Sequence, residues 1–290
     1  MTPVLDADPV PHANSANKPR SANNLTLRVL SALVLAPLAV VAAYYGTWPF
    51  ALFWGAAAIA VLWEWIALVA GSSYPLMFAS CGGAIAIAGF VAWLERPVAA
   101  LLMVGLGVLA AAIFAPAERR LWVSVGIGYA GAMLLAPMFL RADDNYGFAV
   151  IVLLFAVVWT TDVLGYFAGR IFGGPKLLPS VSPKKTWSGA IAGSLGAIVA
   201  ALLIVGLFGS FNKVAIAIVA LVLSVASQIG DLVESWIKRR FNAKDSGRLI
   251  PGHGGVMDRL DGFWAAAVLG CMVGLMRGGF DGPARGLLLW

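Results

Sequence analysis

Residues 235–261 read SWIKRRFNAKDSGRLIPGHGGVMDRLD and stand between two long apolar runs. This stretch holds six of the twenty lysines and arginines, and three aspartates, Asp245, Asp258 and Asp261. Elsewhere the chain is apolar: 61% of its 290 residues are hydrophobic and 12% are charged, whereas a soluble domain is about 45–50% apolar and about 25% charged. We therefore predict an integral membrane protein in which this polar stretch contacts water and carries chemistry on polyanions.

The apolar runs decide the fold class. A membrane-spanning helix needs about 20 mostly apolar residues, and backbone groups in lipid must be satisfied within the segment. Strand-like alternation of polarity is absent, so we predict an all-α fold, a polytopic transmembrane helical bundle with about nine spans. These spans are expected at residues 27–45, 49–70, 76–94, 98–116, 121–140, 147–168, 187–208, 213–234 and 262–280.

The polarity of the segments divides the chain into three parts. Residues 1–26 are polar and rich in Pro, Asn, Ala and Ser, and we expect a disordered tail there. Residues 27–140 are predicted to form N-terminal transmembrane helices with few ionisable groups. Residues 141–290 are predicted to form the C-terminal catalytic region, with cytoplasmic loops at 169–187 and 235–261.

The lysines and arginines predict the orientation, because cytoplasmic loops carry an excess of them. With a cytoplasmic N-terminus, inside segments hold fifteen of these residues and outside segments hold five. We therefore expect a multi-pass protein of the inner (cytoplasmic) membrane whose polar site faces the cytoplasm.

Two acids within apolar runs stand out, since an ionisable group in a membrane span is costly without a partner. Asp162 lies near the end of the sixth span, with Tyr166 one helical turn later on the same face. We assign Asp162 to function, whereas Tyr166 fits an interfacial aromatic or a substrate contact. Glu64 is the one acid within the first five spans, and it fits equally a structural hydrogen bond or a functional role.

The loop before the seventh span resembles a phosphate site. Ser182 can cap a helix and Pro183 suits a first helical position, so we predict that a helix starts here. The free N–H groups of a helix N-terminus attract phosphate, and Lys184, Lys185 and Thr186 add charge and a hydroxyl. A plain helix start with orienting lysines is the alternative.

The third polar region joins the eighth and ninth spans. Asp231 and Ser235 share a helix face, and Glu234 and Lys238 form an ordinary helix pair by the same spacing. If residues 258–261 are helical, Asp258 and Asp261 point the same way at the mouth of the ninth span.

Glycines in this region allow a backbone to approach a ligand closely. Hard cations such as Mg²⁺ take carboxylate oxygens together with substrate phosphates, so the aspartates here are candidate ligands. His253 fits a turn residue or a functional residue equally well.

Three motifs together resemble a known family. The pattern S-x-I-K-R, then K-D-x-G, then I-P-x-H-G-G-V-x-D-R-L-D within residues 235–261 is similar to the signature of the phosphatidate cytidylyltransferases, also called CDP-diacylglycerol synthases. The runs DxxGYFxGR at 162–170 and SPKKTW at 182–187 are similar to that family's as well. Ser188 stands where many members have glutamate, so we place no metal ligand there.

The resemblance implies the reaction CTP + phosphatidate → CDP-diacylglycerol + pyrophosphate, with a Mg²⁺ site of two cations. It also implies a homodimer within the lipid bilayer. The implied metal ligands are Asp231, Asp258 and Asp261, which together with Lys185 and Lys238 form the implied catalytic set. The implied substrate contacts are Asp162, Tyr166, Ser182, Lys184, Thr186, Ser235, Arg239, Lys244, His253, Gly254, Gly255 and Arg259.

Two other functions remain open at this point. A CTP-dependent polyprenol or lipid kinase would transfer a phosphoryl group instead of a nucleotide. An ion-coupled transporter would use its intramembrane acids for ions, but transporters favour broken helices in two repeated halves, and the polar site here is confined to one half. We expect no nucleic-acid partner.

Overall fold

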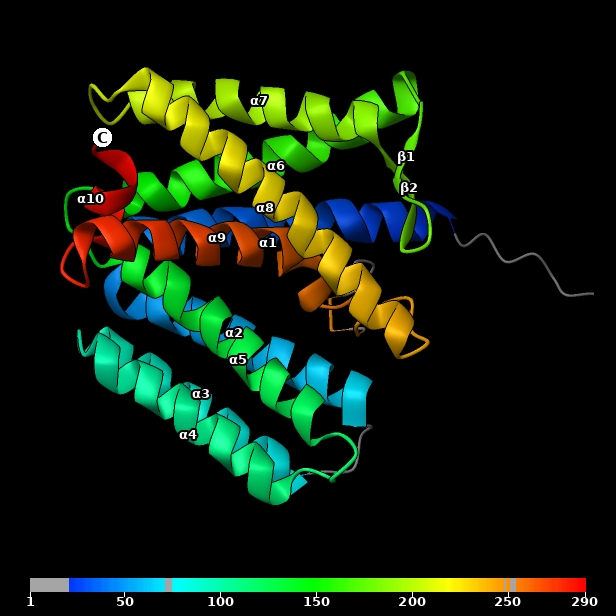
Figure 1. Cartoon of the computed structure of the whole chain (residues 1–290), viewed down its shortest axis with the longest axis vertical. Coiled ribbons are helices and arrows are strands. Elements are labelled where there is room, and N and C mark those ends of the chain that lie inside the picture. The colour runs from blue at the N-terminus through cyan, green and yellow to red at the C-terminus, as the bar shows by residue number, and fades with distance from the viewer. Residues whose placement is uncertain (1–20, 71–74, 248, 251–253) are drawn as a thin grey trace, which may run out of the picture.

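The computed structural model describes residues 21–70, 75–247, 249–250 and 254–290, and helices dominate this part of the chain (Figure 1). The helices, in chain order, are α1 (Ser21–Tyr45), α2 (Thr47–Ala70), α3 (Pro75–Trp93), α4 (Pro97–Phe114), α5 (Arg120–Arg141), α6 (Gly147–Ile171), α7 (Trp187–Gly206), α8 (Lys213–Arg240), α9 (Met257–Gly278) and the short α10 (Pro283–Leu288). A two-stranded hairpin, β1 (Lys176–Leu178) and β2 (Ser182–Thr186), lies between α6 and α7.

The helices confirm the predicted fold class. Within the described residues, 8 helices, α2 to α9, are long and apolar enough to cross a membrane. Helix α1 has a shorter described apolar part, Leu33–Tyr45, so the first predicted span, at residues 27–45, stays a prediction. The chain is therefore an all-α polytopic membrane protein. Of the tail predicted at residues 1–26, residues 1–20 lie outside the described residues, whereas residues 21–26 form the start of α1.

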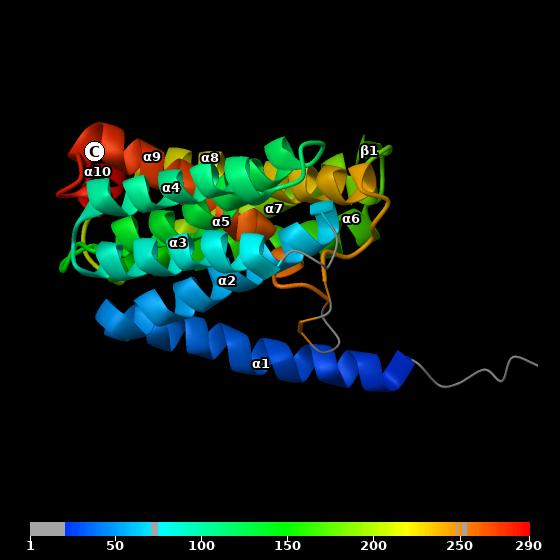
Figure 2. The same cartoon turned by 90° about the horizontal axis from the view of Figure 1, so that it is seen from below.

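The connections alternate between two ends of the bundle, as expected for successive spans. The β1–β2 hairpin and the loop from α8 to α9 lie at one end, whereas α10 and the C-terminus lie at the other (Figures 1 and 2). We call these the hairpin end and the C-terminal end. The polar loops of the predicted catalytic region thus meet on one side of the bundle.

An acid anchors the C-terminal end. Asp143, whose side chain is almost fully buried, accepts hydrogen bonds from the backbone N–H groups of Asn145 and Tyr146, each at 2.9 Å. It also pairs with the Arg285 guanidinium at 2.7 Å. Because Arg285 lies on α10, this contact fixes the last helix against the turn between α5 and α6.

Aromatic stacking holds α2, α5 and α9 together. Trp54 of α2 stacks on Phe263 of α9 with ring centroids 4.7 Å apart, and Tyr129 of α5 stacks on Trp264 at 4.3 Å. The Trp65 indole N–H donates to the Trp122 carbonyl at 2.8 Å. Stacked pairs add about 0.5–1.5 kcal/mol each beyond the area that they bury. This layer fixes α2 beside the start of α9, which matters for the site.

Helices α6 and α7 approach each other closely because glycines face each other at their contact. A Cβ added at Gly193 would overlap the backbone carbonyl of Thr161, and one at Gly189 would overlap that of Gly165. Small residues that let backbones meet are typical of helix contacts in membranes. The contact brings Asp162 and the start of α7 to the same place.

The structure corrects the expected helix start at Ser182. Residues 182–186 pair with β1 as an antiparallel strand, with Leu178 opposite Ser182 and Lys176 opposite Thr186. Helix α7 begins at Trp187, and the hydroxyl of Thr186 caps it by accepting from the Gly189 N–H at 3.2 Å. Thr186 has the extended backbone of an N-cap, so it takes the role that was assigned to Ser182. The lysines therefore lie on a strand just before the helix.

Two helix ends also differ from the prediction. Helix α8 continues past residue 234 to Arg240, and α9 begins at Met257 instead of 262. These extra turns consist largely of polar residues. They lie at the hairpin end of the bundle, where a helix does not have to be apolar on every side. Asp258 and Asp261 are thus helical, as the shared-face argument requires.

Candidate active site

A cavity of about 810 Å³ opens at the hairpin end. Helices α6 to α9 and the hairpin contribute its walls. Of the predicted site residues, the cavity is lined by Asp162, Tyr166, Lys184, Lys185, Thr186, Asp231, Lys238, Asp258, Arg259 and Asp261. The structure therefore brings together residues that lie up to 99 positions apart in the sequence, between Asp162 and Asp261.

Three acids inside this cavity interact with the charge of one lysine. Asp231 of α8 forms an ion pair with Lys185 of β2, and about a third of each side chain is exposed. Asp162 and Asp261 are close enough to Asp231 and Lys185 for their charges to interact. Asp261 accepts a hydrogen bond from the Gly262 N–H at 2.7 Å. The Asp162 carboxylate also interacts with the charge of Arg259, and further lysines and arginines line the cavity, so these acids lie in a wall of mixed charge.

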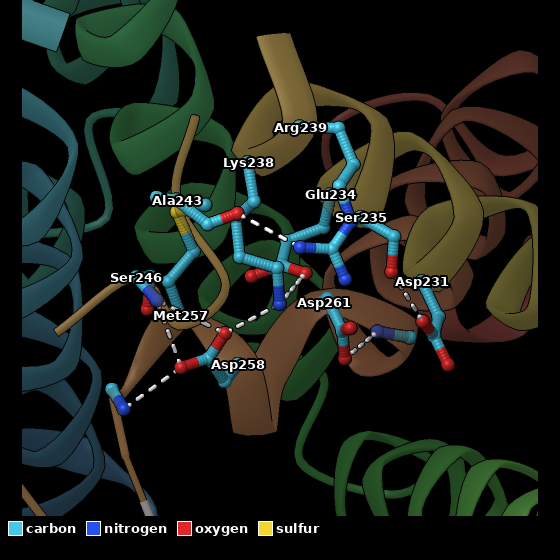
Figure 3. A network of polar contacts seen from close by, with 12 residues as sticks. Asp231, Glu234, Ser235, Lys238, Arg239, Ala243, Ser246, Met257, Asp258 and Asp261 are labelled. Carbon is cyan, nitrogen blue, oxygen red and sulfur yellow. Dashed lines mark hydrogen bonds and ion pairs between the residues drawn. The ribbon is translucent and has the colours of Figure 1, made fainter. Parts of the chain in front are cut away.

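Asp258 is more firmly held than the other acids. Its carboxylate lies 2.6 Å from the Lys238 ammonium and accepts from the backbone N–H groups of Ser246 and Gly255 at 3.0 and 2.9 Å (Figure 3). Lys238 also contacts the buried Glu234 at 2.6 Å. The predicted pair of Glu234 and Lys238 thus forms, but Lys238 bridges two carboxylates.

Glu64 enters this region from the N-terminal half of the chain. Its side chain, 1% exposed, accepts from the Ser246 hydroxyl at 3.0 Å and from the N–H groups of Val256 and Met257, both at 2.9 Å. We call Glu64 with these three donors the Glu64 clasp. Glu64 therefore makes hydrogen bonds of the kind that the structural interpretation predicts, and it holds the residues that lead into α9.

Some predicted substrate contacts lie outside the cavity wall. Two of them contact residues of the wall. The Ser235 hydroxyl donates to Asp231 at 3.3 Å, and the Gly255 N–H donates to Asp258 at 2.9 Å. Gly254 adopts a left-handed backbone conformation (φ 92°) beside the Asp258 carboxylate. The Arg239 guanidinium bonds the Ala243 carbonyl at 3.1 Å.

The remaining predicted contacts are placed as follows. Ser182 is half-buried in β2, and Lys244 is exposed in the loop after α8. His253 lies outside the described residues. Ser188, where the sequence departs from the family pattern, bonds the Gly173 carbonyl and the Thr186 hydroxyl. It therefore ties the hairpin to the start of α7.

The sequence reasoning did not assign several residues that line the cavity. Arg170 and Lys176 add cations at the hairpin side, and the Arg170 guanidinium donates to the Tyr166 hydroxyl at 3.0 Å. Gln228 and Asp245 also line the wall. Helical spacing offered a signal for two of them, since Arg170 follows Tyr166 and Gln228 precedes Asp231 on consecutive turns.

The acids fit a magnesium site that substrate completes. Among the described residues, no three carboxylate, histidine or cysteine side chains converge tightly enough to enclose a metal ion on their own. Mg²⁺ commonly keeps several waters and binds through one or two carboxylates plus substrate phosphates. Asp231 and Asp261 offer such oxygens on the cavity wall, and Asp258 lies beside them with Lys238 as its present partner.

Comparison with known proteins gives a consistent result. Residues 26–276 match the model of the cytidylyltransferase family. A phosphatidate cytidylyltransferase of Brucella suis is 42% identical over 265 residues, covering 90% of this chain and 97% of that protein. The one of Brucella abortus (strain 9-941) is 44% identical over 250 residues, covering 85% and 92%. One of Staphylococcus saprophyticus is 41% identical over 141 residues, covering 48% and 51%.

Proposed function

Because the chain belongs to the cytidylyltransferase family, we propose that it transfers the cytidylyl group of CTP to phosphatidate, giving CDP-diacylglycerol and pyrophosphate. The observation that carries this proposal is the cavity at the hairpin end, whose wall combines Asp162, Asp231, Asp258 and Asp261 with lysines and arginines. Two polyanionic substrates need cations, and a bound metal needs acids, so the mixed wall suits both.

In the proposed reaction, a phosphate oxygen of phosphatidate attacks the α-phosphorus of CTP. A new P–O bond forms there, and the bond from the α-phosphorus to the bridging oxygen of the β-phosphate breaks, so pyrophosphate leaves. The nucleophile is an anion near neutral pH, and no proton has to be removed first. Such transfers depend mainly on positioning and charge stabilisation.

The chain's own residues divide these tasks. Lys184 and Lys185 of β2, with Arg170 and Lys176 nearby, offer positive charge to phosphate groups at the hairpin side. Lys238 and Arg259 offer it from α8 and α9. Asp231, Asp258 and Asp261 would hold Mg²⁺, which when bound polarises phosphoryl oxygens and offsets the charge of the leaving group.

The lipid has to reach this cavity while its tails remain in the bilayer. Helix α6 supports such a path, because Val163 and Phe167 on its outer surface are 52% and 54% exposed next to the wall residues Asp162 and Tyr166. An apolar outer face beside a polar wall suits a substrate with a charged head and apolar tails. We propose that phosphatidate enters sideways along α6.

The product decides between this function and its alternatives. Purified protein should be incubated with phosphatidate, Mg²⁺ and CTP labelled in its α-phosphate. We expect the label in a CDP-lipid, with release of pyrophosphate. A lipid kinase would instead release labelled CDP and leave the lipid unlabelled, and that result would overturn the proposal.

Orientation and assembly remain part of the proposal. The positive charge at the hairpin end supports a cavity that faces the cytoplasm, where CTP is made, in the inner membrane of a bacterium.

Ser180 in the hairpin turn and Ser210 between α7 and α8 are both exposed, and the native cysteines are buried. We expect a membrane-impermeant thiol reagent to label Ser180→Cys only from the cytoplasmic side and Ser210→Cys only from outside. The reverse pattern would contradict the orientation. The homodimer also stays a prediction.

A further inference from the structure

We propose that Glu64 is a positioning residue for cytidylyl transfer: through the Glu64 clasp, it fixes the loop that presents Asp258 and Asp261 to the substrates. This inference rests on the proposed function. It assigns to an acid of α2, in the N-terminal half, a part in the chemistry of the C-terminal half.

The clasp first sets the start of α9. The first N–H groups of a helix have no partner within the helix, and a carboxylate at this end is also favoured by the helix dipole. Two of the three hydrogen bonds that Glu64 accepts come from the backbone N–H groups of Val256 and Met257, which lie at the start of α9. A residue from another helix thus fixes the end from which the catalytic acids project.

The same loop is bonded to Asp258 from its other side. Ser246 gives its hydroxyl to Glu64 and its backbone N–H to Asp258. The consecutive residues Gly255 and Val256 donate in the same divided way: the Gly255 N–H bonds Asp258, and the Val256 N–H bonds Glu64. Ser246, Gly255 and Val256 therefore lie between two carboxylates, and a shift at Glu64 is passed to Asp258 through these residues.

The glycines of the signature make room for this arrangement. A Cβ at Gly247 would overlap the Glu64 carboxylate, and one at Gly255 would overlap Glu64 and the Ser246 hydroxyl. Two positions of the signature are therefore shaped by an acid that lies outside it. That fit would be unnecessary if Glu64 only filled space in α2.

Asp143 provides a matched control. It is a buried acid that also accepts two backbone N–H groups and one side-chain donor, but it lies at the C-terminal end, away from the cavity. Both Glu64→Gln and Asp143→Asn keep the side-chain volume and turn an acceptor toward a donor. A purely structural role predicts the same consequence for both variants.

The experiment compares the two variants in full-length protein. Steady-state kinetics with varied CTP and Mg²⁺, thermal unfolding and amide hydrogen exchange are measured for each. We expect Glu64→Gln to lower kcat at least tenfold with a smaller change in KM for CTP, and to speed exchange at residues 255–257. Asp143→Asn should lower Tm but keep kcat within twofold. Ser246→Ala, which removes one bond of the clasp without opposing donors, should lower kcat by a smaller factor.

Each outcome decides the inference. A Glu64→Gln protein with wild-type kcat would overturn it, as would losses of kcat in both variants that merely follow the loss of folded protein. If Glu64→Gln does not fold, the test falls to Ser246→Ala. A Ser246→Ala protein with wild-type kcat and wild-type amide hydrogen exchange would then overturn the inference. Wild-type protein that makes no CDP-lipid would overturn the proposed function instead, and unchanged exchange at residues 255–257 in Glu64→Gln would overturn the clasp by itself.

Discussion

Two groups of carboxylates meet at the hairpin end, and they are used in opposite ways. Glu64 is 1% exposed and has three donors from the protein. Asp231 is about a third exposed and has Lys185 and the Ser235 hydroxyl as partners on the cavity wall. A carboxylate with its oxygens satisfied by the chain holds structure in place, whereas one with spare oxygens is available to cations and substrates. Asp258 combines both features, since it holds the loop and lines the cavity.

The largest effect is expected from the available acids. Asp231→Asn and Asp261→Asn each keep the side-chain size but lose a charge on the cavity wall, and losing a metal ligand costs several kcal/mol of transition-state stabilisation. We expect CDP-lipid formation to fall by at least about 100-fold in each, which corresponds to about 2.7 kcal/mol, with no loss of Tm. Near-normal rate and Mg²⁺ dependence in both variants would place the metal site elsewhere.

The acid with both roles should show both effects. Asp258→Asn replaces the carboxylate beside the Lys238 ammonium with an amide, so Lys238 keeps only Glu234 as an ionic partner. Breaking a buried ion pair costs about 3–5 kcal/mol of folding free energy when nothing else compensates. We expect a lower Tm together with a rate reduced about 10- to 100-fold. Thermal unfolding and kinetics on the same preparation check this. A loss of rate with an unchanged Tm would show that Asp258 belongs with Asp231 and Asp261.

The helical fold could be predicted from the sequence, because apolar run length is a local property. The helix ends could not be predicted in this way. The last turns of α8 and the first turn of α9 are polar, so the apolar run ends before the helix does. The hairpin was missed because its strands have 3 and 5 residues, too few for a pattern. The positions of Asp231 and Asp261 followed from the return of two spans to one face. The partners of Glu64 did not, because they are bonds across 182 to 193 positions.

A third test asks whether Gly247 is a glycine because the Glu64 side chain occupies the space beside it. Gly247→Ala places a methyl group against Glu64, and overpacking of this kind costs about 1–3 kcal/mol of folding free energy. Glu64→Ala removes the obstacle, so the penalty of Gly247→Ala should shrink in that background. A double-mutant cycle on unfolding free energy should give a coupling of about 1–2 kcal/mol. Additive penalties would show that the glycine is needed for another reason.

The smallest effect is expected from the two adjacent lysines. Lys185 pairs with Asp231 and Lys184 is exposed on the same strand, so they differ in their link to the acids. Lys185→Ala should raise KM for CTP or phosphatidate about five- to tenfold, or about 1 kcal/mol; Lys184→Ala should raise it less. Titrations of each substrate check the difference. Unchanged kinetics in both variants would reduce this strand to an orientation signal.

The separation of Glu64 from its donors also has a consequence for synthesis. Chains grow at about 5–20 residues per second, so the 182 to 193 positions between them correspond to roughly 10–40 s of translation. During that interval α2 carries an acid whose later partners do not yet exist, and such a group is costly in lipid. We expect nascent chains arrested before residue 246 to remain bound to insertion factors longer with glutamate at position 64 than with leucine, as site-specific cross-linking would measure. The arrival of the loop is thus also the moment at which the first half of the bundle can settle in the membrane.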